Sequence, residues 1–251
     1  MRLAVEALRV DYDAPEGGIL TALGPVSFGI ESGAFVCLVG PSGCGKSSLI
    51  RVLAGLQTPT QGRVRLDGSL VTEPSARVGL MFQDSNLMPW RTVLDNVALP
   101  FELAGMPKSE RYEAVDSLLP ALGLDGFAQA YPGELSGGMA QRVALGRVLI
   151  QEPDILLLDE PFGALDALTR EQISVDLLRV WAHTRQTVLM VTHDIREAVL
   201  LADRVLVMSH RPGCIIVDVS VPLSRPRALD DTYRGDFLDI VRTVRAAIDR
   251  A

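Results

Sequence analysis

A glycine-rich segment between a predicted buried strand and a predicted helix places the strongest constraint on how this chain folds. The apolar run Ala34–Val39 leads into Gly-Pro-Ser-Gly-Cys-Gly-Lys-Ser at residues 40–47, with the spacing G-x-x-x-x-G-K-[ST]. Leu49, Ile50 and Leu53 follow at helical spacing. The glycines let successive N–H groups point inward at an anion, and the helix N-terminus adds partial positive charge. The sequence therefore predicts a phosphate-binding loop that joins a strand to a helix.

A second predicted strand ends in two acidic residues. Ile155–Leu158 is entirely apolar and runs into Asp159 and Glu160. Parallel strands end at one edge of their sheet, so we expect Asp159 beside the phosphate loop, where it would hold Mg²⁺ through water. Glu160, one residue on, would polarise an attacking water. Two solvated loop acids are the competing interpretation, and this pattern by itself does not decide between them.

The other strand patterns divide the chain into an α/β core and a helical insertion. Short apolar runs at Thr187–Val191 and Val205–Met208 predict further buried parallel strands, with helical patterns between them. The N-terminal stretch and Gly62–Leu66 alternate apolar and polar residues, which predicts an antiparallel layer at one edge. Strand patterns are absent from about Ser85 to Pro153. The predicted fold class is therefore α/β with a mostly parallel sheet.

Three helices are predicted outside this core. One follows an N-cap at Ser109 and is kinked or ended by Pro120. A second begins near Ser136 and runs to Gln151. The third is an amphipathic helix beyond Val219, with apolar residues at helical spacing at Phe237, Val241, Val244 and Ile248.

Composition excludes several classes of protein. The 24 basic and 31 acidic residues give a net charge of −7, so the basic surface that DNA binding requires is not expected. No apolar run reaches the 18 or so residues of a membrane span, and Glu6 stands where a signal peptide would be apolar. The three cysteines are odd in number and lack metal-type spacing. These features predict a protein of a reducing, cytoplasmic compartment.

A Ser-Gly-Gly segment precedes the acidic strand and carries a family resemblance. Its residues are Leu135, Ser136, Gly137, Gly138 and Met139, where Met139 replaces a more usual Gln. Because they precede a predicted helix, their N–H groups form a second anion cradle. The segment resembles the signature of ATP-binding cassette (ABC) ATPases, in the order that family has, and the resemblance covers roughly residues 3 to 215. It implies a P-loop NTPase (RecA-like) core with an N-terminal antiparallel β layer and an α-helical insertion subdomain.

The resemblance also implies roles for individual residues. Tyr12 resembles the aromatic residue that stacks on adenine, and Gln83 the glutamine that contacts Mg²⁺ and the attacking water. Asp166 matches the loop that crosses a dimer interface, and His193 the histidine that contacts the γ-phosphate. The catalytic residues implied are Glu160, His193 and Lys46. The ATP-binding residues implied are Tyr12, Gly40, Pro41, Ser42, Gly43, Cys44, Gly45, Lys46, Ser47, Ser48 and Gln83. The metal ligands implied are Ser47, Gln83 and Asp159. The contacts implied to the partner protomer's ATP are Leu135, Ser136, Gly137, Gly138, Met139 and Gln141.

Domain organisation and partners follow from the same resemblance. It implies one ABC ATPase domain over 1–251, with its core at 1–84 and 154–218, a helical subdomain at 85–153 and a helical tail at 219–251. The cofactors implied are ATP and Mg²⁺. The partners implied are a second copy in an ATP-dependent homodimer, two integral membrane permease subunits and, indirectly, a periplasmic or surface solute-binding protein. The implied location is the cytoplasmic face of the inner membrane, as a peripheral protein.

Residues 82–93, 210–213 and 222–227 are similar to nitrate, sulfonate and taurine importers. Importers of other small polar solutes, such as polyamines or amino acids, remain alternatives, as does a non-transport assembly ATPase. Leu87–Trp90 is expected either to dock a membrane subunit or to pack locally. A small P-loop kinase or GTPase is less favoured, because the sequence has no Asn-Lys-x-Asp and neither class needs Leu-Ser-Gly-Gly.

Overall fold

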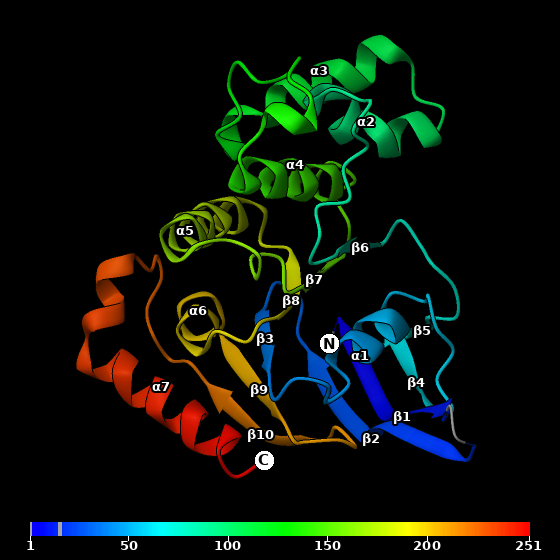
Figure 1. The fold of residues 1–251 in the computed structure, drawn as a ribbon, viewed down its shortest axis with the longest axis vertical. Helices are drawn as coiled ribbons and strands as arrows, with labels where there is room; N and C mark the ends of the chain where they lie inside the picture. Colours follow the sequence, from blue (N-terminus) through cyan, green and yellow to red (C-terminus); the bar gives the residue numbers. More distant parts are fainter. Residues whose placement is uncertain (1, 15–16) are drawn as a thin grey trace.

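The computed structural model describes residues 2–14 and 17–251, which form two sheets surrounded by helices (Figure 1). The strands are β1 (Leu3–Asp13), β2 (Ile19–Ile30), β3 (Phe35–Val39), β4 (Gln61–Leu66), β5 (Ser69–Leu70), β6 (Val78–Met81), β7 (Ile155–Asp159), β8 (Thr187–Val191), β9 (Arg204–Met208) and β10 (Ile215–Ser220). The helices are α1 (Lys46–Leu53), α2 (Val93–Leu103), α3 (Lys108–Leu118), α4 (Gly137–Leu149), α5 (Ala167–Thr184), α6 (Ile195–Leu201) and α7 (Gly235–Ile248). Short 3₁₀ turns lie at Pro120–Leu122, Pro132–Glu134 and Leu229–Tyr233.

The larger sheet has six strands in the order β10-β9-β3-β8-β7-β6. All neighbours in it are parallel except β10 and β9, so the predicted mostly parallel α/β class is confirmed. The four expected core strands are present, whereas β6 and β10 were not predicted. On central β3, Phe35 and Cys37 face a core shared with α5, α6 and α7, and Val36 and Leu38 face a core shared with α1. Successive strand residues point to opposite faces, so β3 is buried on both.

The smaller sheet is the predicted antiparallel layer. Its four strands run in the order β2-β1-β4-β5. A tight turn at Asp67 and Gly68, both at positive φ, joins β4 to β5. Such a turn is the two-residue hairpin that an Asp-Gly pair favours. This sheet shares its apolar side with α1, so α1 lies between the two sheets.

The stretch from Ser85 to Pro153 is helical in the structure and contains no strand among its residues. Figure 1 shows α2, α3 and α4 standing away from the sheets, with β6 and β7 leading to them. A Cβ atom at Gly146 of α4 would lie 2.5 Å from Leu122 Cδ1. Glycine at this mid-helix position therefore lets α4 approach its neighbours closely, which the sequence pattern does not explain.

The ends of the predicted helices differ in detail from those observed. The expected N-cap at Ser109 is wrong, because extended Pro107 precedes α3 and the helix already begins at Lys108. The expected stop at Pro120 is confirmed, since α3 ends at Leu118 and a 3₁₀ turn begins at Pro120. A proline cannot donate the next helical hydrogen bond. Helix α4 ends two residues before the predicted Gln151.

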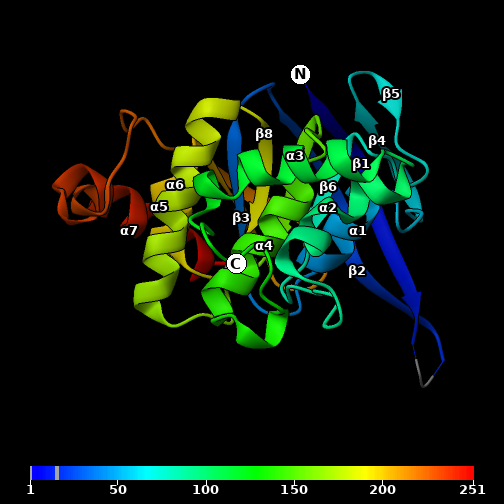
Figure 2. The same ribbon diagram turned by 90° about the horizontal axis from the view of Figure 1, so that it is seen from above.

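The tail returns to the larger sheet through α7. Phe237, Val244 and Ala247 are buried on one face of this helix, as its amphipathic pattern predicts. In Figure 1, α7 runs along the outside of β9 and β10, and Figure 2 shows it on the opposite side of the molecule from β4 and β5. Within the described ranges, no helix is both long enough and apolar enough to cross a membrane.

Candidate functional site

The phosphate loop lies between buried β3 and α1, as predicted. Gly43 and Gly45 have φ angles of 74° and 104°, a region that side-chain-bearing residues rarely adopt. A Cβ atom at Gly45 would lie 2.8 Å from the carbonyl oxygen of Ala22 on β2. The loop is therefore curled against β2 in a shape that requires glycine at these two positions.

Lys46 begins α1 and is held inside the loop. Its ammonium group donates hydrogen bonds to the carbonyl oxygens of Gly40 and Pro41, each at 2.9 Å. The residue is only 7% exposed. A compact ammonium charge at this place compensates the charge of a phosphate bound to the surrounding N–H groups.

A cavity of about 380 Å³ opens above the loop and brings Tyr12, Lys46, Ser47 and Glu160 together. Tyr12 comes from β1, and its hydroxyl donates to Gln57 Oε1 at 3.0 Å. Because the phenol has a single proton, its 2.8 Å contact with the Ser48 hydroxyl is a hydrogen bond that Ser48 donates. Tyr12 is thereby tied to α1 at the cavity wall.

Arg211 also lines this cavity, and the sequence analysis did not identify it as a site residue. Its Nε and Nη2 both donate to the carbonyl oxygen of Gly43, at 3.2 Å. The β9–β10 loop that carries it is bonded to β2, since Gly213 N donates to Ala22 O and Gly24 N donates to Gly213 O. The only signal in the sequence is Arg-Pro-Gly at 211–213. This tripeptide belongs to the segments that resemble nitrate, sulfonate and taurine importers, but the resemblance assigned no role to Arg211.

Ser47 and Asp159 meet beside the loop. Burial raises the pKa of the Asp159 carboxyl above its ordinary value, and a hydrogen bond from Ser47 acts in the opposite direction. Mg²⁺ prefers one or two carboxylates together with hydroxyl, water and phosphate oxygens. Oxygen donors of this kind are what Asp159 and Ser47 provide, so the pair fits a Mg²⁺ ion. No cluster of three His, Cys, Asp or Glu residues suited to a metal is found within 2–14 and 17–251.

Glu160 and His193 form a pair at the carboxyl ends of β7 and β8. The distance from Glu160 Oε2 to His193 Nδ1 is 3.3 Å. Glu160 has a φ of 47°, and its N–H donates to the carbonyl of Val191 on β8. A Cβ atom at Gly163 would lie 3.5 Å from Glu160 Oε2 and 3.6 Å from Gln83 Nε2, which brings Gln83 to the same edge.

The Ser-Gly-Gly segment begins α4, and its residues do not line the cavity around Lys46. Ser136 is the N-cap, and its hydroxyl accepts a hydrogen bond from Met139 N at 3.3 Å. A Cβ atom at Gly138 would lie 2.7 Å from Thr169 Cγ2 on α5, so α4 and α5 meet closely here. Figure 1 shows α4 in the helical part above the sheets, on the other side of β6 from α1.

Asp166 and Gln141 are placed differently from one another. Asp166 is exposed at the N-cap of α5, where hydrogen bonds from Thr169 lower the pKa of its carboxyl. Gln141 is 5% exposed, and its amide nitrogen donates to the carbonyl of Gln83 at 2.8 Å. Gln141 therefore links the Gln83 segment to α4 within the chain, whereas Asp166 faces solvent.

The fold and site resemble those of known proteins. Residues 23–163 match the ABC transporter family model. The nitrate import ATP-binding protein NrtD of Synechocystis is 48% identical over 82% of this chain and 77% of its own. The taurine import ATP-binding protein TauB of Rhizobium johnstonii is 48% identical over 98% of this chain and 96% of its own. A third relative, the aliphatic sulfonates import ATP-binding protein SsuB of Bacillus cereus, is 42% identical over 86% of this chain and 85% of its own.

Solved structures agree with these relatives. A dimeric, post-hydrolysis state of the ATP-binding cassette MJ0796 bound to ADP and Pi superposes with a TM-score of 0.77 and is 32% identical. The match covers 88% of this chain and all of that one. The two sheets, the helical insertion and the phosphate loop are thus an arrangement already seen with a hydrolysed nucleotide.

Proposed function

Because the chain belongs to the ABC transporter family, it is an ATP-binding and ATP-hydrolysing protein, and we propose that it drives import through separate membrane subunits. The observation that carries the site assignment is the cavity in which Lys46, Ser47 and Glu160 meet above a glycine-dependent loop. The cavity offers phosphate-binding N–H groups and a carboxylate at one place. Hydrolysis of a terminal phosphate needs both.

In the proposed reaction, water attacks the γ-phosphorus of ATP in line with the leaving ADP. The main-chain N–H groups of residues 42–47 and the Lys46 ammonium hold the phosphates and stabilise the charge that develops on them. Glu160 orients the water and accepts its proton as the new P–O bond forms and the bond to ADP breaks. His193 contacts the γ-phosphate and, through its 3.3 Å contact, holds the Glu160 carboxylate in place. Mg²⁺, bound by Ser47, Asp159 and Gln83, would supply neutralising charge at the β- and γ-phosphates.

We add Arg211 to the expected ATP-binding residues. Its guanidinium bonds the carbonyl of Gly43 and lies on the cavity wall beside the phosphate loop. These two bonds fix the orientation of the Gly43 carbonyl in the loop, and the guanidinium charge adds to that of Lys46. Arg211 is a positioning residue of the phosphate site.

Removing the Lys46 ammonium tests the phosphate-loop assignment. Lys46→Ala should weaken ATP binding by at least roughly tenfold, because a charge-assisted hydrogen bond contributes about 1.5–3 kcal/mol. The matched control is Lys108→Ala, since Lys108 is the only other lysine and lies on α3 over the Tyr112 ring. ATP affinity of both variants within twofold of wild type, in a calorimetric titration, would contradict the assignment.

The active unit is proposed to be a homodimer with two composite sites. The Ser136 cradle does not reach the Lys46 cavity within one chain, so a second chain must supply it. A two-fold arrangement completes both sites at once. Ser136→Arg should then leave nucleotide binding by the monomer intact and abolish hydrolysis.

Mixing two inactive variants tests this composite site. Equal amounts of Ser136→Arg and Lys46→Ala chains should recover up to roughly a quarter of the wild-type ATPase rate, because half of random dimers are heterodimers with one complete site of two. The rate is measured against mixing ratio at fixed total protein, alongside sizing with ATP and with ADP. A rate that stays at zero for every ratio would mean that the sites are not shared.

The cargo and location are proposed from the relatives. Three of them are named for import of nitrate, taurine or aliphatic sulfonates, so we propose a small anion or sulfonate as cargo. The chain would then bind two permease subunits at the cytoplasmic face of the inner membrane, supplied by a solute-binding protein. Exposed Trp90 and half-buried Leu87 and Met88 follow Gln83 and are the proposed permease contact. Deletion of the gene should abolish growth on taurine or another sulfonate as sole sulfur source, or on nitrate as sole nitrogen source. Growth unaffected on all of them would exclude this cargo class.

A further inference from the structure

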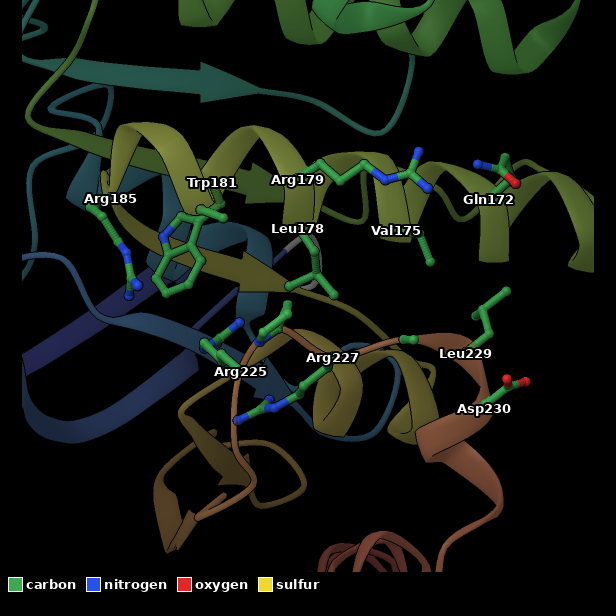
Figure 3. A pocket seen from close by; sticks show the side chains of 13 residues that line it. Gln172, Val175, Leu178, Arg179, Trp181, Arg185, Arg225, Arg227, Leu229 and Asp230 are labelled. Carbon is green, nitrogen blue, oxygen red and sulfur yellow. The ribbon is translucent and has the colours of Figure 1, made fainter.

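A second cavity, of about 700 Å³, lies between the outer half of α5 and the tail segment 225–230 (Figure 3). We call it the α5–tail pocket. Leu178 and Trp181 of α5 and Leu229 of the tail give it apolar walls, and Arg179, Arg185 and Arg225 lie around it. Its volume is in the range of small-molecule sites, which are mostly apolar with a few polar groups. None of its lining residues belongs to the cavity around Lys46.

The tail side of this pocket is held firmly by Arg227. Its guanidinium is buried and donates to five carbonyl oxygens, which belong to Val199, Leu200, Ala202, Val221 and Leu223. Those bonds fasten the tail to the end of α6 and to the stretch after β10. The pocket is thus preformed, which lowers the entropy that a ligand must lose on binding.

The indole of Trp181 forms the end of the pocket, and two guanidinium groups pack against its ring. Arg185 lies over the ring at 5.0 Å and Arg225 at 4.1 Å. In Figure 3 the ring hangs from α5 with Arg185 beside it and Arg225 below it. The indole N–H is already bonded to the carbonyl of Gln186. The residue is only 3% exposed and two guanidinium groups lie over its ring, so a ligand in the pocket reaches only a small, apolar part of the indole.

Positive charge at this pocket is incompletely balanced. Arg225 pairs with Asp203, and Arg179 pairs with Asp176. Arg185 is exposed, and no carboxylate of residues 2–14 and 17–251 lies within ion-pair distance of it. Arg227 bonds carbonyls rather than carboxylates, and burial lowers its pKa to about 10, so it stays charged at neutral pH. Asp230 is the one acid among the lining residues.

The structure assigns to the α5–tail pocket a site for a small organic anion with an apolar or aromatic body. The acid group pairs with the exposed Arg185 guanidinium, and the apolar body lies against Trp181, Leu178 and Leu229. In a chain of net charge −7, an exposed arginine that has no carboxylate partner among the described residues and lies beside an apolar wall complements this ligand chemistry. The assignment is independent of ATP hydrolysis, because the two cavities share no residue.

The chain provides its own fluorescent reporter for the test. Its two tryptophans are Trp90 and Trp181, so Trp90→Phe leaves only the indole in the pocket. This variant is titrated with 8-anilino-1-naphthalenesulfonate, an aromatic anion. Trp181 emission should be quenched saturably by one molecule per chain. The neutral analogue N-phenyl-1-naphthylamine, which has the same rings without the sulfonate, should bind at least roughly tenfold more weakly.

Variants in the Trp90→Phe background locate the site. Arg185→Gln should weaken binding of the sulfonate by roughly tenfold, and Arg63→Gln, an equal charge change on β4, should leave it within twofold. Ala182→Phe fills the pocket from an exposed position of α5 and keeps every arginine, so it should also weaken binding. Saturating Mg²⁺-ADP should leave the sulfonate affinity unchanged.

Three results would overturn the assignment. The first is equal affinity for the sulfonate and its neutral analogue. The second is binding that neither Arg185→Gln nor Ala182→Phe weakens. The third is displacement of the sulfonate by Mg²⁺-ADP, which would place it in the nucleotide cavity. Circular dichroism of each variant separates loss of binding from loss of fold.

Discussion

In the nucleotide cavity, positive potential comes mainly from main-chain N–H groups and one buried ammonium, whereas in the α5–tail pocket it comes from arginine side chains. The first uses consecutive residues, 40–47, in which Gly43 and Gly45 have positive φ angles. The second joins residues of α5 to a tail segment some 50 positions later in the chain. Main-chain N–H groups can converge on a phosphate only where the backbone has an unusual shape. A side-chain site has no such requirement.

This difference explains why one site has a sequence motif and the other has none. A Cβ atom at Gly45 would collide with the backbone of β2, so the residue type is dictated by the loop. Around the α5–tail pocket, the walls are ordinary core residues such as Leu178 and Trp181, and the arginines come from both α5 and the tail segment. A motif search therefore finds the first site and overlooks the second.

The largest expected effect is on the ATPase rate, and it should leave anion binding at the α5–tail pocket unchanged. Glu160→Gln keeps the shape of the side chain and loses its ability to accept a proton, so the ATPase rate should fall by roughly 10²–10⁴ while ATP still binds. Binding of the aromatic sulfonate should be unchanged. Steady-state phosphate release and the Trp181 titration measure the two. An unchanged rate of hydrolysis would make Glu160 only a surface acid.

Arg227→Met should break the pocket and spare the nucleotide cavity. It leaves five carbonyls without their donor, which should cost about 2–4 kcal/mol of stability and roughly 5–15 °C in melting temperature. Sulfonate binding should be lost, with ATP affinity within twofold of wild type. Arg242→Met, at an exposed arginine of α7, is the control and should change little. Equal losses of both affinities would mean that the two cavities are coupled.

Arg211 sharpens the comparison, because it is an arginine in the cavity whose other positive groups are main-chain N–H groups and the Lys46 ammonium. Arg211→Ala should weaken ATP binding by roughly three- to tenfold, since it removes a charge-assisted hydrogen bond to the Gly43 carbonyl. Arg211→Lys keeps the positive charge but cannot donate two hydrogen bonds in the planar geometry of a guanidinium, so it should recover only part of the lost ATP affinity. Calorimetry with ATP measures both, and Arg63→Ala controls for net charge. ATP affinity unchanged in Arg211→Ala would remove Arg211 from the site.

The smallest expected effect concerns Glu197, a buried carboxylic acid on α6. Burial raises the pKa of its carboxyl, although hydroxyls of Thr192 and Ser174 donate to it. A raised folded-state pKa means that its stabilisation is present below about pH 4.5 and is lost as pH rises through the folded value. Glu197→Gln should therefore be more stable than wild type at pH 8, because the amide has no charge to bury, and the gain should be smaller at pH 5.

Thermal unfolding against pH measures the Glu197 effect. Glu171→Gln, at an exposed position of α5, is the matched control and should show no pH-dependent gain. A gain for Glu197→Gln that is the same at both pH values would show that the carboxyl does not titrate between them.

Elements with strong local signals were predicted well, and their ends and partners were not. The strands β3, β7, β8 and β9 could be predicted from their own residues, since a short, fully apolar segment must be covered on both faces. The predicted N-cap at Ser109 is wrong because the extended segment ends at Pro107, two residues earlier than the capping pattern suggests. The need for glycine at position 146 depends on a tertiary contact, because Leu122 from another part of the chain packs against it.

By itself the sequence determined the phosphate loop, the acidic strand end and the parallel core, because each depends on residues adjacent in the chain. The tertiary structure decided which distant groups meet. It placed Arg211 on the Gly43 carbonyl, Glu160 against His193, and Arg185 and Arg225 around one indole. These contacts join strands and helices whose spacing is set by how the sheets and helices pack together. An arginine near a tryptophan in space has no fixed separation in sequence, so only the folded chain reveals the second cavity.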